Sequence, residues 1–175
     1  MATRVLDLCA GSGAIGCAVL ARAFGARVSF GEIDPKHEAT ILKNIRENHL
    51  DASPHSAKAS RDKRADIRIG DLFEPFENER FDLIAINPPY IPSGRELDTS
   101  VTDYEPAGAL YSGDDGLDLI RRIACELPRH LAQGGSAWIE VDSAHASAAR
   151  DLFSDQGFTP EIMNDHYGVP RIIRI

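Results

Sequence analysis

Residues 7–16 read Asp-Leu-Cys-Ala-Gly-Ser-Gly-Ala-Ile-Gly and overlap the end of a short apolar run at residues 4–8. The apolar run predicts a strand, and the residues from 14 to about 24 have the spacing of a helix. A Gly-x-Gly-x-x-Gly turn between a strand and a helix lets a ligand approach the backbone closely. By itself this turn does not select the ligand, because dinucleotide-binding proteins wrap it around a pyrophosphate. It does predict an open α/β sheet.

Strand and helix periods alternate along the rest of the chain, which predicts a parallel sheet with helices on both faces. The further strands are expected at residues 27–33, 66–70, 81–86, 136–141, 158–163 and 170–175. The further helices are expected at residues 35–48, 117–131, where residues 133–135 form the stop signal, and 144–156. Residues 50–65 are expected to form a surface loop, and residues 88–114 an ordered loop that faces a substrate.

At 175 residues the chain is long enough for one substantial core, and we expect a single domain over residues 1–175. The net charge of −8 disfavours an extended nucleic-acid surface, because phosphate contacts need clustered Lys and Arg. Three cysteines, an odd number, favour a reducing compartment, and buried, inert thiols are expected at Cys9, Cys17 and Cys125. No apolar run approaches about 20 residues, so no membrane span is expected. The first strand starts too early to leave room for a signal peptide, so the default expectation is a cytoplasmic enzyme.

The sequence Asn87-Pro88-Pro89-Tyr90 directly follows the strand expected at residues 81–86. Ligands bind at the carboxyl ends of strands in open α/β sheets. The side-chain carbonyl of Asn87 and the main-chain carbonyl of Pro88 are two hydrogen-bond acceptors, and proline makes the turn stiff before a ligand arrives. The ring of Tyr90 can cover one face of a planar group. Such a turn suits a flat, weakly nucleophilic nitrogen held in front of an electrophile, although a tight turn that merely ends the strand is the simpler interpretation.

The Asn-Pro-Pro-Tyr sequence resembles that of amino-methyltransferases, which use S-adenosylmethionine (SAM). Seven strands with a closing pair likewise resemble the doubly wound, Rossmann-like sheet of SAM-dependent methyltransferases, with an antiparallel hairpin at the carboxyl end. The resemblance implies catalytic roles for Asn87, Pro88, Pro89 and Tyr90. Acceptors on both N–H groups of an amide would push electron density onto its nitrogen, and orientation would supply most of the rate gain. The same turn would serve an exocyclic amine of adenine or guanine.

Three carboxylates follow three successive strands and suit this cofactor. Asp7 would repel a pyrophosphate but suits the cationic methionyl end of SAM, unless it only stabilises the turn. Glu32 can accept both ribose hydroxyls, and it fits this role better than Asp34, which precedes Pro35 as a helix cap. Asp71 could accept from the adenine amino group while Leu72 packs on the ring, unless Asp71 is a solvated loop residue. The full set expected to bind SAM is Asp7, Cys9, Ala10, Gly11, Gly13, Gly16, Glu32, Ile33, Asp71, Leu72 and Asn87.

Residues 104–110 read Tyr-Glu-Pro-Ala-Gly-Ala-Leu and residues 113–117 read Gly-Asp-Asp-Gly-Leu. With Asn-Pro-Pro-Tyr-Ile at residues 87–91, they resemble the HemK/PrmC family of peptide-chain release-factor glutamine methyltransferases, as does the pattern at residues 157–171. This resemblance implies methylation of the glutamine side-chain nitrogen in the Gly-Gly-Gln sequence of release factors. Asn87 and Pro88 would bind the glutamine amide and Tyr90 would pack against it. Glu105 would order the loop over the substrate or have a purely structural role.

The sequence departs from the family pattern in three places. The family has a helical amino-terminal domain and a Thr-Glu pair ahead of the first strand, which we do not find here. The alternatives are a shortened form, a divergent minimal form, or an activating partner subunit that supplies the missing part. Residues 53–64 are longer than the pattern predicts, and Glu140-Val141-Asp142 replaces an expected Glu-x-Gly.

Two other functions share these motifs. One is an amino-methyltransferase acting on RNA or DNA, against which the net charge and residues 105–117 count. The other is a SAM-binding subunit that needs a partner. A dehydrogenase would leave Asp7 and Asn87 without a role. No metal site is expected, because His130, His145 and His166 are scattered, and we expect surface or packing roles for them.

Overall fold

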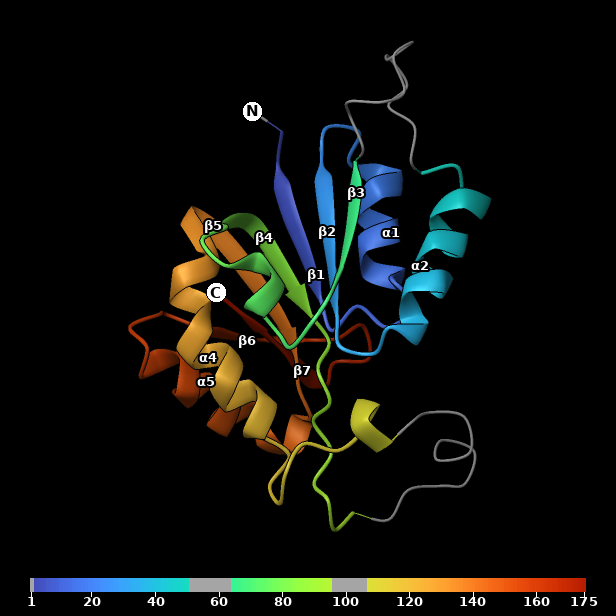
Figure 1. The fold of residues 1–175 in the computed structure, drawn as a ribbon. Coiled ribbons are helices and arrows are strands. Elements are labelled where there is room, and N and C mark those ends of the chain that lie inside the picture. The colour runs from blue at the N-terminus through green and yellow to red at the C-terminus, as the bar shows by residue number, and fades with distance from the viewer. Residues whose placement is uncertain (1, 51–63, 96–106) are drawn as a thin grey trace. The chain divides into compact units, whose positions relative to one another are not determined.

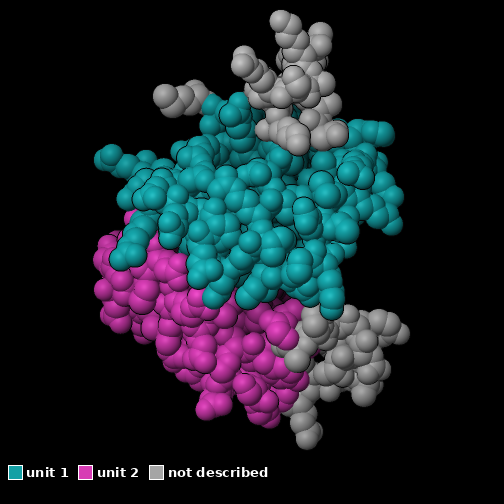
Figure 2. Space-filling view, in the orientation of Figure 1, with its two compact units in different colours: residues 1–86, 129–137 teal, residues 87–128, 138–175 magenta. Residues whose placement is uncertain are grey.

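The computed structural model describes residues 2–50, 64–95 and 107–175, and Figure 1 shows the course of the chain. Contacts divide the chain into two compact units, which Figure 2 shows in different colours. Unit 1 comprises Met1–Ile86 and Arg129–Ala137, and unit 2 comprises Asn87–Pro128 and Trp138–Ile175. The chain passes from unit 1 to unit 2 twice, so each unit contains segments that are distant in the sequence.

Seven strands form one sheet, as the sequence predicts. They are β1 (Arg4–Leu8), β2 (Arg27–Glu32), β3 (Ala65–Ile69), β4 (Phe81–Ile86), β5 (Leu131–Glu140), β6 (Glu161–Asn164) and β7 (Pro170–Arg174). Their order is β3-β2-β1-β4-β5-β7-β6. β1 pairs in parallel with β2 and β4, and β2 with β3, whereas β7 pairs antiparallel with β5 and β6. The expected doubly wound, mostly parallel sheet with a carboxyl-terminal antiparallel hairpin is confirmed.

In unit 1, the helices α1 (Ala14–Arg22) and α2 (Lys36–Glu47) cover one face of the strands β1 to β3 (Figure 1). Ile41 and Ile45 lie one turn apart on α2 and pack into a cluster with Val28 and Phe30. These side chains are buried, and burial of each contributes roughly 1.5–3 kcal/mol to the stability of the unit.

The opposite face of unit 1 packs on the segment that follows β3. Phe30 and Gly31 point to opposite faces of β2, because successive strand residues alternate. A Cβ at Gly31 would lie 2.8 Å from Cε2 of Phe76, which ends the 3-10 helix η1 (Glu74–Phe76). Phe73 stacks on His130 with ring centroids 4.5 Å apart and planes 10° apart. These aromatic contacts form the second layer of the unit 1 core.

The carboxyl ends of β1, β2 and β3 lie at one edge of unit 1. Backbone hydrogen bonds join them: Ala10 N donates to Gly31 O at 3.0 Å, and Gly70 N donates to Glu32 O at 2.9 Å. The turn after β1, the end of β2 and Asp71 after β3 therefore share this edge, which is where ligands bind in such sheets.

In unit 2, the helix α5 (Ala146–Ser154) packs on β6 and β7. Asp165 closes the turn between these strands, because its Oδ1 accepts hydrogen bonds from Tyr167 N at 2.8 Å and Val169 N at 3.0 Å. The remaining elements are η2 (Ala107–Ala109), α4 (Asp118–His130) and η3 (Ser143–His145). None of the helices in the described ranges has the length and apolar content needed to cross a membrane.

Several expected boundaries are wrong. α4 ends at His130 and β5 starts at Leu131, so residues 133–135 belong to the strand and do not stop the helix. The backbone needs Gly135 for another reason, since a Cβ there would lie 3.0 Å from Asp82 O. Residues 143–145 form η3 ahead of α5, and β6 starts at Glu161 and not at residue 158.

Parts of the two expected loops, residues 51–63 and 96–106, lie outside the described residues. The parts of the second loop that are described contain an isolated β-bridge between Ile91 and Tyr111.

Candidate functional site

The glycine turn after β1 leaves its backbone accessible at Gly11. This residue has φ +53, and no atom of the described residues lies within 4 Å of the position that a Cβ would take. Gly13 N donates to Ala10 O at 2.7 Å and closes the turn before α1 begins. The turn therefore offers the open backbone surface that close approach of a ligand requires.

Gly16 is required for packing. A Cβ at this position would lie 2.3 Å from Cε1 of Phe30, so only glycine lets α1 come this close to β2. Gly13 is intermediate, because its Cβ would lie 3.1 Å from the same ring atom. The three glycines of the motif thus have different physical roles.

Asp7 is 2% exposed, and its Oδ2 accepts a hydrogen bond from Gly16 N at 2.7 Å. Burial raises the pKa of this carboxyl from 3.8 to about 7, the Gly16 N–H opposes the rise, and the charge of Glu32 adds to it. The hydrogen bond stabilises the first turn of α1. This is the structural role that the sequence allows as the alternative to a contact with SAM. The expected contact with a cofactor remains a prediction.

Glu32 is 7% exposed and is bonded to three backbone N–H groups. Its Oε2 accepts from Gly11 N at 2.7 Å, and its Oε1 accepts from Ile33 N at 2.8 Å and Asp34 N at 3.0 Å. A carboxylate has about four lone-pair sites, so acceptor capacity remains for a ligand hydroxyl. Asp34 accepts from Lys36 N at 2.9 Å instead, in agreement with a role at the start of α2.

Cys9 has φ +58, a left-handed conformation that few residues other than glycine adopt. Burial, together with the charges of Glu32, Asp7 and Asp71, raises the pKa of its thiol to about 12. The thiol is therefore neutral and inert at pH 7. The expectation of buried thiols is wrong for Cys125, which is exposed, and Cys9 and Cys17 are only half-buried.

Ile33 and Leu72, two apolar residues of the expected SAM-binding set, differ in accessibility. Ile33 follows the end of β2 and is 64% exposed. Leu72 is 6% exposed and has φ +47, so most of its side chain packs inside the protein. Ile33 is the residue of the two that offers apolar surface to a ligand.

The Asn-Pro-Pro-Tyr sequence begins one residue after β4 and belongs to unit 2. Asn87 is exposed, Pro88 is buried, and Pro89 and Tyr90 are half-buried. The hydroxyl of Tyr90 donates to Oε1 of Glu140 at 3.3 Å. Burial and then the charge of Glu140 raise the pKa of this phenol above its ordinary value of 10. The amide of Asn87 is thus open to solvent, while the Tyr90 hydroxyl has a protein partner.

The predicted site residues therefore form two groups. Those of unit 1 share one edge of the sheet, and those of unit 2 lie in the turn after β4; Glu105 lies outside the described residues. The contact of Glu140 with Tyr90 and the ion pair of Arg95 with Asp142 are not predicted by the sequence. The sequence offers one indication that Glu140 belongs to the site, which is its position at the end of a strand, as for Glu32. Within the described ranges, His, Cys, Asp and Glu side chains form no group of three that could hold a metal ion.

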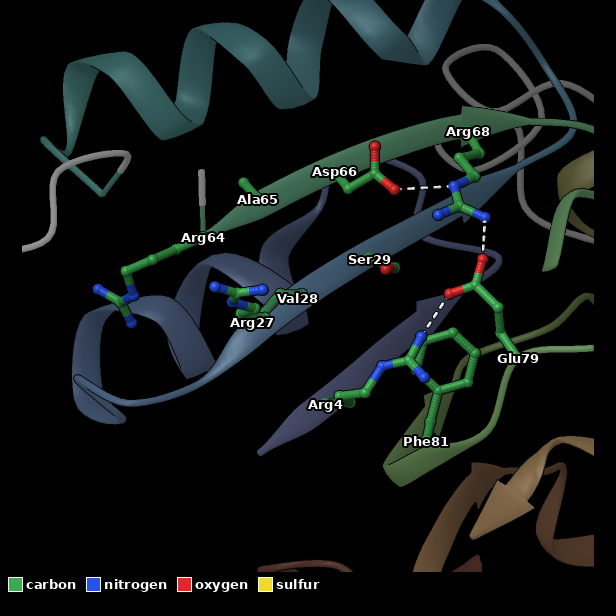
Figure 3. Close-up of a pocket in the computed structure, with 10 residues that line it drawn as sticks. All are labelled: Arg4, Arg27, Val28, Ser29, Arg64, Ala65, Asp66, Arg68, Glu79 and Phe81. Carbon is green, nitrogen blue, oxygen red and sulfur yellow. Dashed lines mark hydrogen bonds and ion pairs between the residues drawn. The ribbon is translucent and has the colours of Figure 1, made fainter. Parts of the chain in front are cut away.

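A separate hollow of about 220 Å³ lies at the amino ends of β1, β2 and β3 in unit 1 (Figure 3). Arg4 and Arg68 both form ion pairs with Glu79 across it, and Arg68 also pairs with Asp66 at 2.7 Å. Arg64 donates to three backbone carbonyls and is buried. These arginines are engaged within the protein, and their position is at the strand ends opposite to those where ligands bind.

The strand order together with the glycine turn after β1 defines the fold of SAM-dependent methyltransferases. A ribosomal protein L11 methylase from Lactobacillus delbrueckii has this fold with a TM-score of 0.65 and 14% identity, over 99% of this chain and 68% of that one. An RNA methyltransferase from Salinibacter ruber, solved with S-adenosyl-L-homocysteine, gives a TM-score of 0.57 and 19% identity over 98% and 78% of the two chains. The chain belongs to the family described as Conserved hypothetical protein 95, whose model matches residues 1–108.

The resemblance to the HemK/PrmC family is confirmed by curated relatives. The release factor glutamine methyltransferase of Geobacter sulfurreducens is 35% identical over 98% of this chain and 57% of its own length. That of Chlamydia trachomatis is 32% identical over 97% and 54%. A ribosomal protein uL3 glutamine methyltransferase of Francisella tularensis is 35% identical over 90% and 46%. The chain thus spans about half the length of these relatives.

Proposed function

We propose that residues 1–175 form a single catalytic domain of a SAM-dependent methyltransferase that modifies a glutamine side chain of a protein. The observation that carries the proposal is the open turn and carboxylates at the ends of β1 to β3, together with Asn-Pro-Pro-Tyr directly after β4. The names of the relatives support it, because each of the three is called a glutamine methyltransferase.

The residues of the unit 1 edge fit SAM. Gly11 leaves space beside the backbone, and Glu32 retains acceptor capacity for a ribose hydroxyl. Asp7, whose pKa is raised to about 7, gives the edge a negative charge once its carboxyl is ionised, and this charge favours a cation and opposes a pyrophosphate, directly or through water. Ile33 offers apolar surface for adenine. When bound, SAM supplies an electrophilic methyl group on a positive sulfur.

The turn after β4 fits a primary amide. Asn87 is exposed, so its side-chain oxygen is free to accept one N–H of the substrate amide, and the Pro88 carbonyl is proposed to accept the other. Pro89 stiffens the turn, and the Tyr90 ring is proposed to pack on the amide plane. Rate acceleration would come from orientation of a poor nucleophile, which well-placed groups can supply without a general base.

We propose the glutamine of the Gly-Gly-Gln sequence in peptide-chain release factors as the substrate, and the cytoplasm as the compartment in which they meet. The release factor is the substrate that the names of most of the similar relatives give. Since those relatives are about twice as long, a further segment or an activating subunit is proposed to strengthen binding of the release factor, whereas methyl transfer is proposed to need only residues 1–175.

Ribosomal protein uL3 is the second candidate substrate, because one relative with 35% identity is named for it. Both candidates present a glutamine amide, so the turn after β4 does not discriminate between them. Nucleic acid is the weaker alternative, since the net charge of −8 opposes a polyanion.

The test is mass spectrometry of a purified release factor, uL3 and an RNA after incubation with this chain and SAM. A gain of about 14 Da on the Gly-Gly-Gln glutamine supports the proposal, and a release factor with that glutamine replaced by asparagine is the matched control. A gain on uL3 alone would reassign the substrate. A gain on RNA alone, or on none of the three while SAM binds, would refute the proposed function.

A further inference from the structure

The segment of residues 90–95, which we call the strap, follows the Asn-Pro-Pro turn and pairs with residues 110–113 of unit 2. Ile91 N donates to Leu110 O at 2.9 Å, and Ser112 N donates back to Ile91 O at 2.9 Å. Ser93 N then donates to Gly113 O at 2.8 Å. The middle of the strap is thus held by backbone hydrogen bonds.

Each end of the strap meets a carboxylate at the end of β5. At the first end, the Tyr90 hydroxyl donates to Glu140 Oε1 at 3.3 Å. At the second end, Nη1 of Arg95 lies 2.6 Å from Oδ2 of Asp142. We call Glu140 and Asp142 the clamp. All of these residues belong to unit 2.

Both clamp residues have further contacts that fix their positions. Glu140 lies in β5, where it is in register with Ile172 of β7. The other oxygen of Asp142, Oδ1, accepts from Ala144 N at 2.9 Å at the start of η3. Burial of Asp142 would raise the pKa of its carboxyl, but the Ala144 N–H and the Arg95 guanidinium outweigh burial and lower it. Asp142 is therefore ionised at neutral pH and attracts Arg95.

A third contact restricts the backbone of Tyr90. A Cβ at Gly116 would lie 2.4 Å from Tyr90 O, so the glycine lets the loop after residue 113 press against the strap. Tyr90 is thus held at its carbonyl side by this loop and at its hydroxyl by Glu140. Contacts at both ends restrict the direction in which the Tyr90 side chain points.

We propose that Glu140 and Asp142 are positioning residues: they hold Tyr90 and Arg95 so that the Asn-Pro-Pro-Tyr turn keeps one conformation before substrate binds. The proposal rests on the proposed function, in which Tyr90 packs on the substrate amide. Neither clamp residue touches the reacting atoms, so each acts on turnover through the strap.

The first test compares E140A with E140Q. The glutamine variant keeps an oxygen that can accept from Tyr90, whereas the alanine variant leaves the hydroxyl without this partner. E140A is expected to lower kcat about fivefold, the effect of one lost hydrogen bond, and E140Q is expected to restore most of it. KM for SAM should stay the same in both. A Y90F/E140A double variant should be no slower than Y90F, because each of the two changes removes the same hydrogen bond.

The second test separates the ion pair from the helix cap at Asp142. D142N keeps Oδ1 as acceptor for Ala144 N and loses the charge that attracts Arg95. D142N and R95Q are expected to lower kcat to the same extent, about twofold since Arg95 is largely exposed. The double variant should match either single variant. If the losses of kcat in D142N and R95Q added up in the double variant, the ion pair between Arg95 and Asp142 would not be their cause.

A third measurement does not depend on catalysis. Hydrogen exchange at the amides of Ile91, Ser93 and Ser112 is expected to rise in E140A and D142N, while the amides of β2 stay unchanged. Faster exchange with lower kcat supports the proposal. Unchanged exchange, or faster exchange with unchanged kcat, overturns it. If the unmodified chain methylates none of the three substrates, the proposed function fails and with it the catalytic role of the clamp, whereas the exchange data still decide whether the clamp holds the strap.

Discussion

The carboxylate edge of unit 1 and the strap of unit 2 are held by different kinds of contact. At the edge, Glu32 accepts hydrogen bonds from three backbone N–H groups and Asp7 accepts one such bond, so the carboxylates are part of the turns that they stabilise. The ends of the strap depend on contacts between side chains, Tyr90 with Glu140 and Arg95 with Asp142. The edge is therefore complete whenever unit 1 is folded, whereas the strap can be loosened by single substitutions that leave unit 2 folded.

The sharpest separation of the two regions comes from N87A. This change removes a proposed acceptor of the substrate amide and should lower methyl transfer by at least about 100-fold. Affinity for SAM, measured by calorimetry, should stay within a few-fold, because every residue of the expected SAM-binding set except Asn87 lies in unit 1. N48A, at an exposed asparagine at the end of α2, is the matched control. Loss of SAM binding in N87A would show that the two regions are not separable.

The carboxyls of the two regions should respond to pH with opposite sign. The pKa of Asp7 is raised to about 7, so between about pH 4 and 7 the folded chain binds a proton that the unfolded chain has lost. Stability should fall as pH rises through this window, by up to about 1.4 kcal/mol per pH unit, and change no further above it. The pKa of Asp142 is lowered, so its contribution is present above its ordinary pKa and is lost as pH falls.

Urea unfolding of the unmodified chain, D7N and D142N from pH 4 to 8 checks these signs. D7N should remove the loss of stability that occurs as pH rises from 4 to 7. D142N should reduce the loss of stability that occurs as pH falls into the acid range. The same pH dependence in all three proteins would contradict the placement of Asp7 in a desolvated site. If SAM binds beside Asp7, its affinity should rise with pH through 7, because a cation favours the ionised carboxyl.

The packing of the edge is tested by G16A. The new Cβ would lie 2.3 Å from Cε1 of Phe30 and 3.0 Å from Oδ2 of Asp7. We expect a loss of about 1–3 kcal/mol in the free energy of unfolding, as for other overpacked positions. G25A is the control, since no described atom lies within 4 Å of its Cβ position. Equal unfolding midpoints for the two variants would mean that α1 does not need its close approach to β2.

The smallest effect concerns the thiols. Cys125 in unit 2 is exposed, whereas burial raises the pKa of both Cys9 and Cys17 in unit 1. A maleimide at pH 7 should label Cys125 first, and C125S should leave stability and activity nearly unchanged. Rapid labelling of Cys9 in the native protein, detected by peptide mapping, would show that the edge opens more readily than its backbone contacts imply.

The sequence predicts most of the fold because its apolar periods and turn residues agree. β1 and β4 have the predicted boundaries, and the glycine turn and the Asn-Pro-Pro-Tyr sequence follow them as expected. The wrong boundary at residues 133–135 has a tertiary cause, since Gly135 is required by the approach of Asp82 O and not by a helix end. The exposure of Cys125 could have been predicted, because it lies two residues after the buried Ile123, on the other side of the helix.

The site is less predictable than the fold. The carboxylates at strand ends are visible in the sequence, but the bonds of Glu32 to three N–H groups depend on how two turns meet. The partners of Tyr90 and Arg95 come from about 50 residues further along the chain, and local patterns carry no information about such pairs.

The division of unit 1 between two stretches of sequence determines the order in which a ribosome can complete it. β4 leaves the ribosome long before β5, its neighbour in the sheet, which begins at Leu131. At ordinary rates of synthesis this delay is a few seconds. During that time β4 has an unpaired apolar edge, the kind of surface that promotes aggregation. We therefore expect Met1–Ile86 expressed alone to aggregate, and we expect a shortened form of this chain to need residues 129–137 to close its first unit.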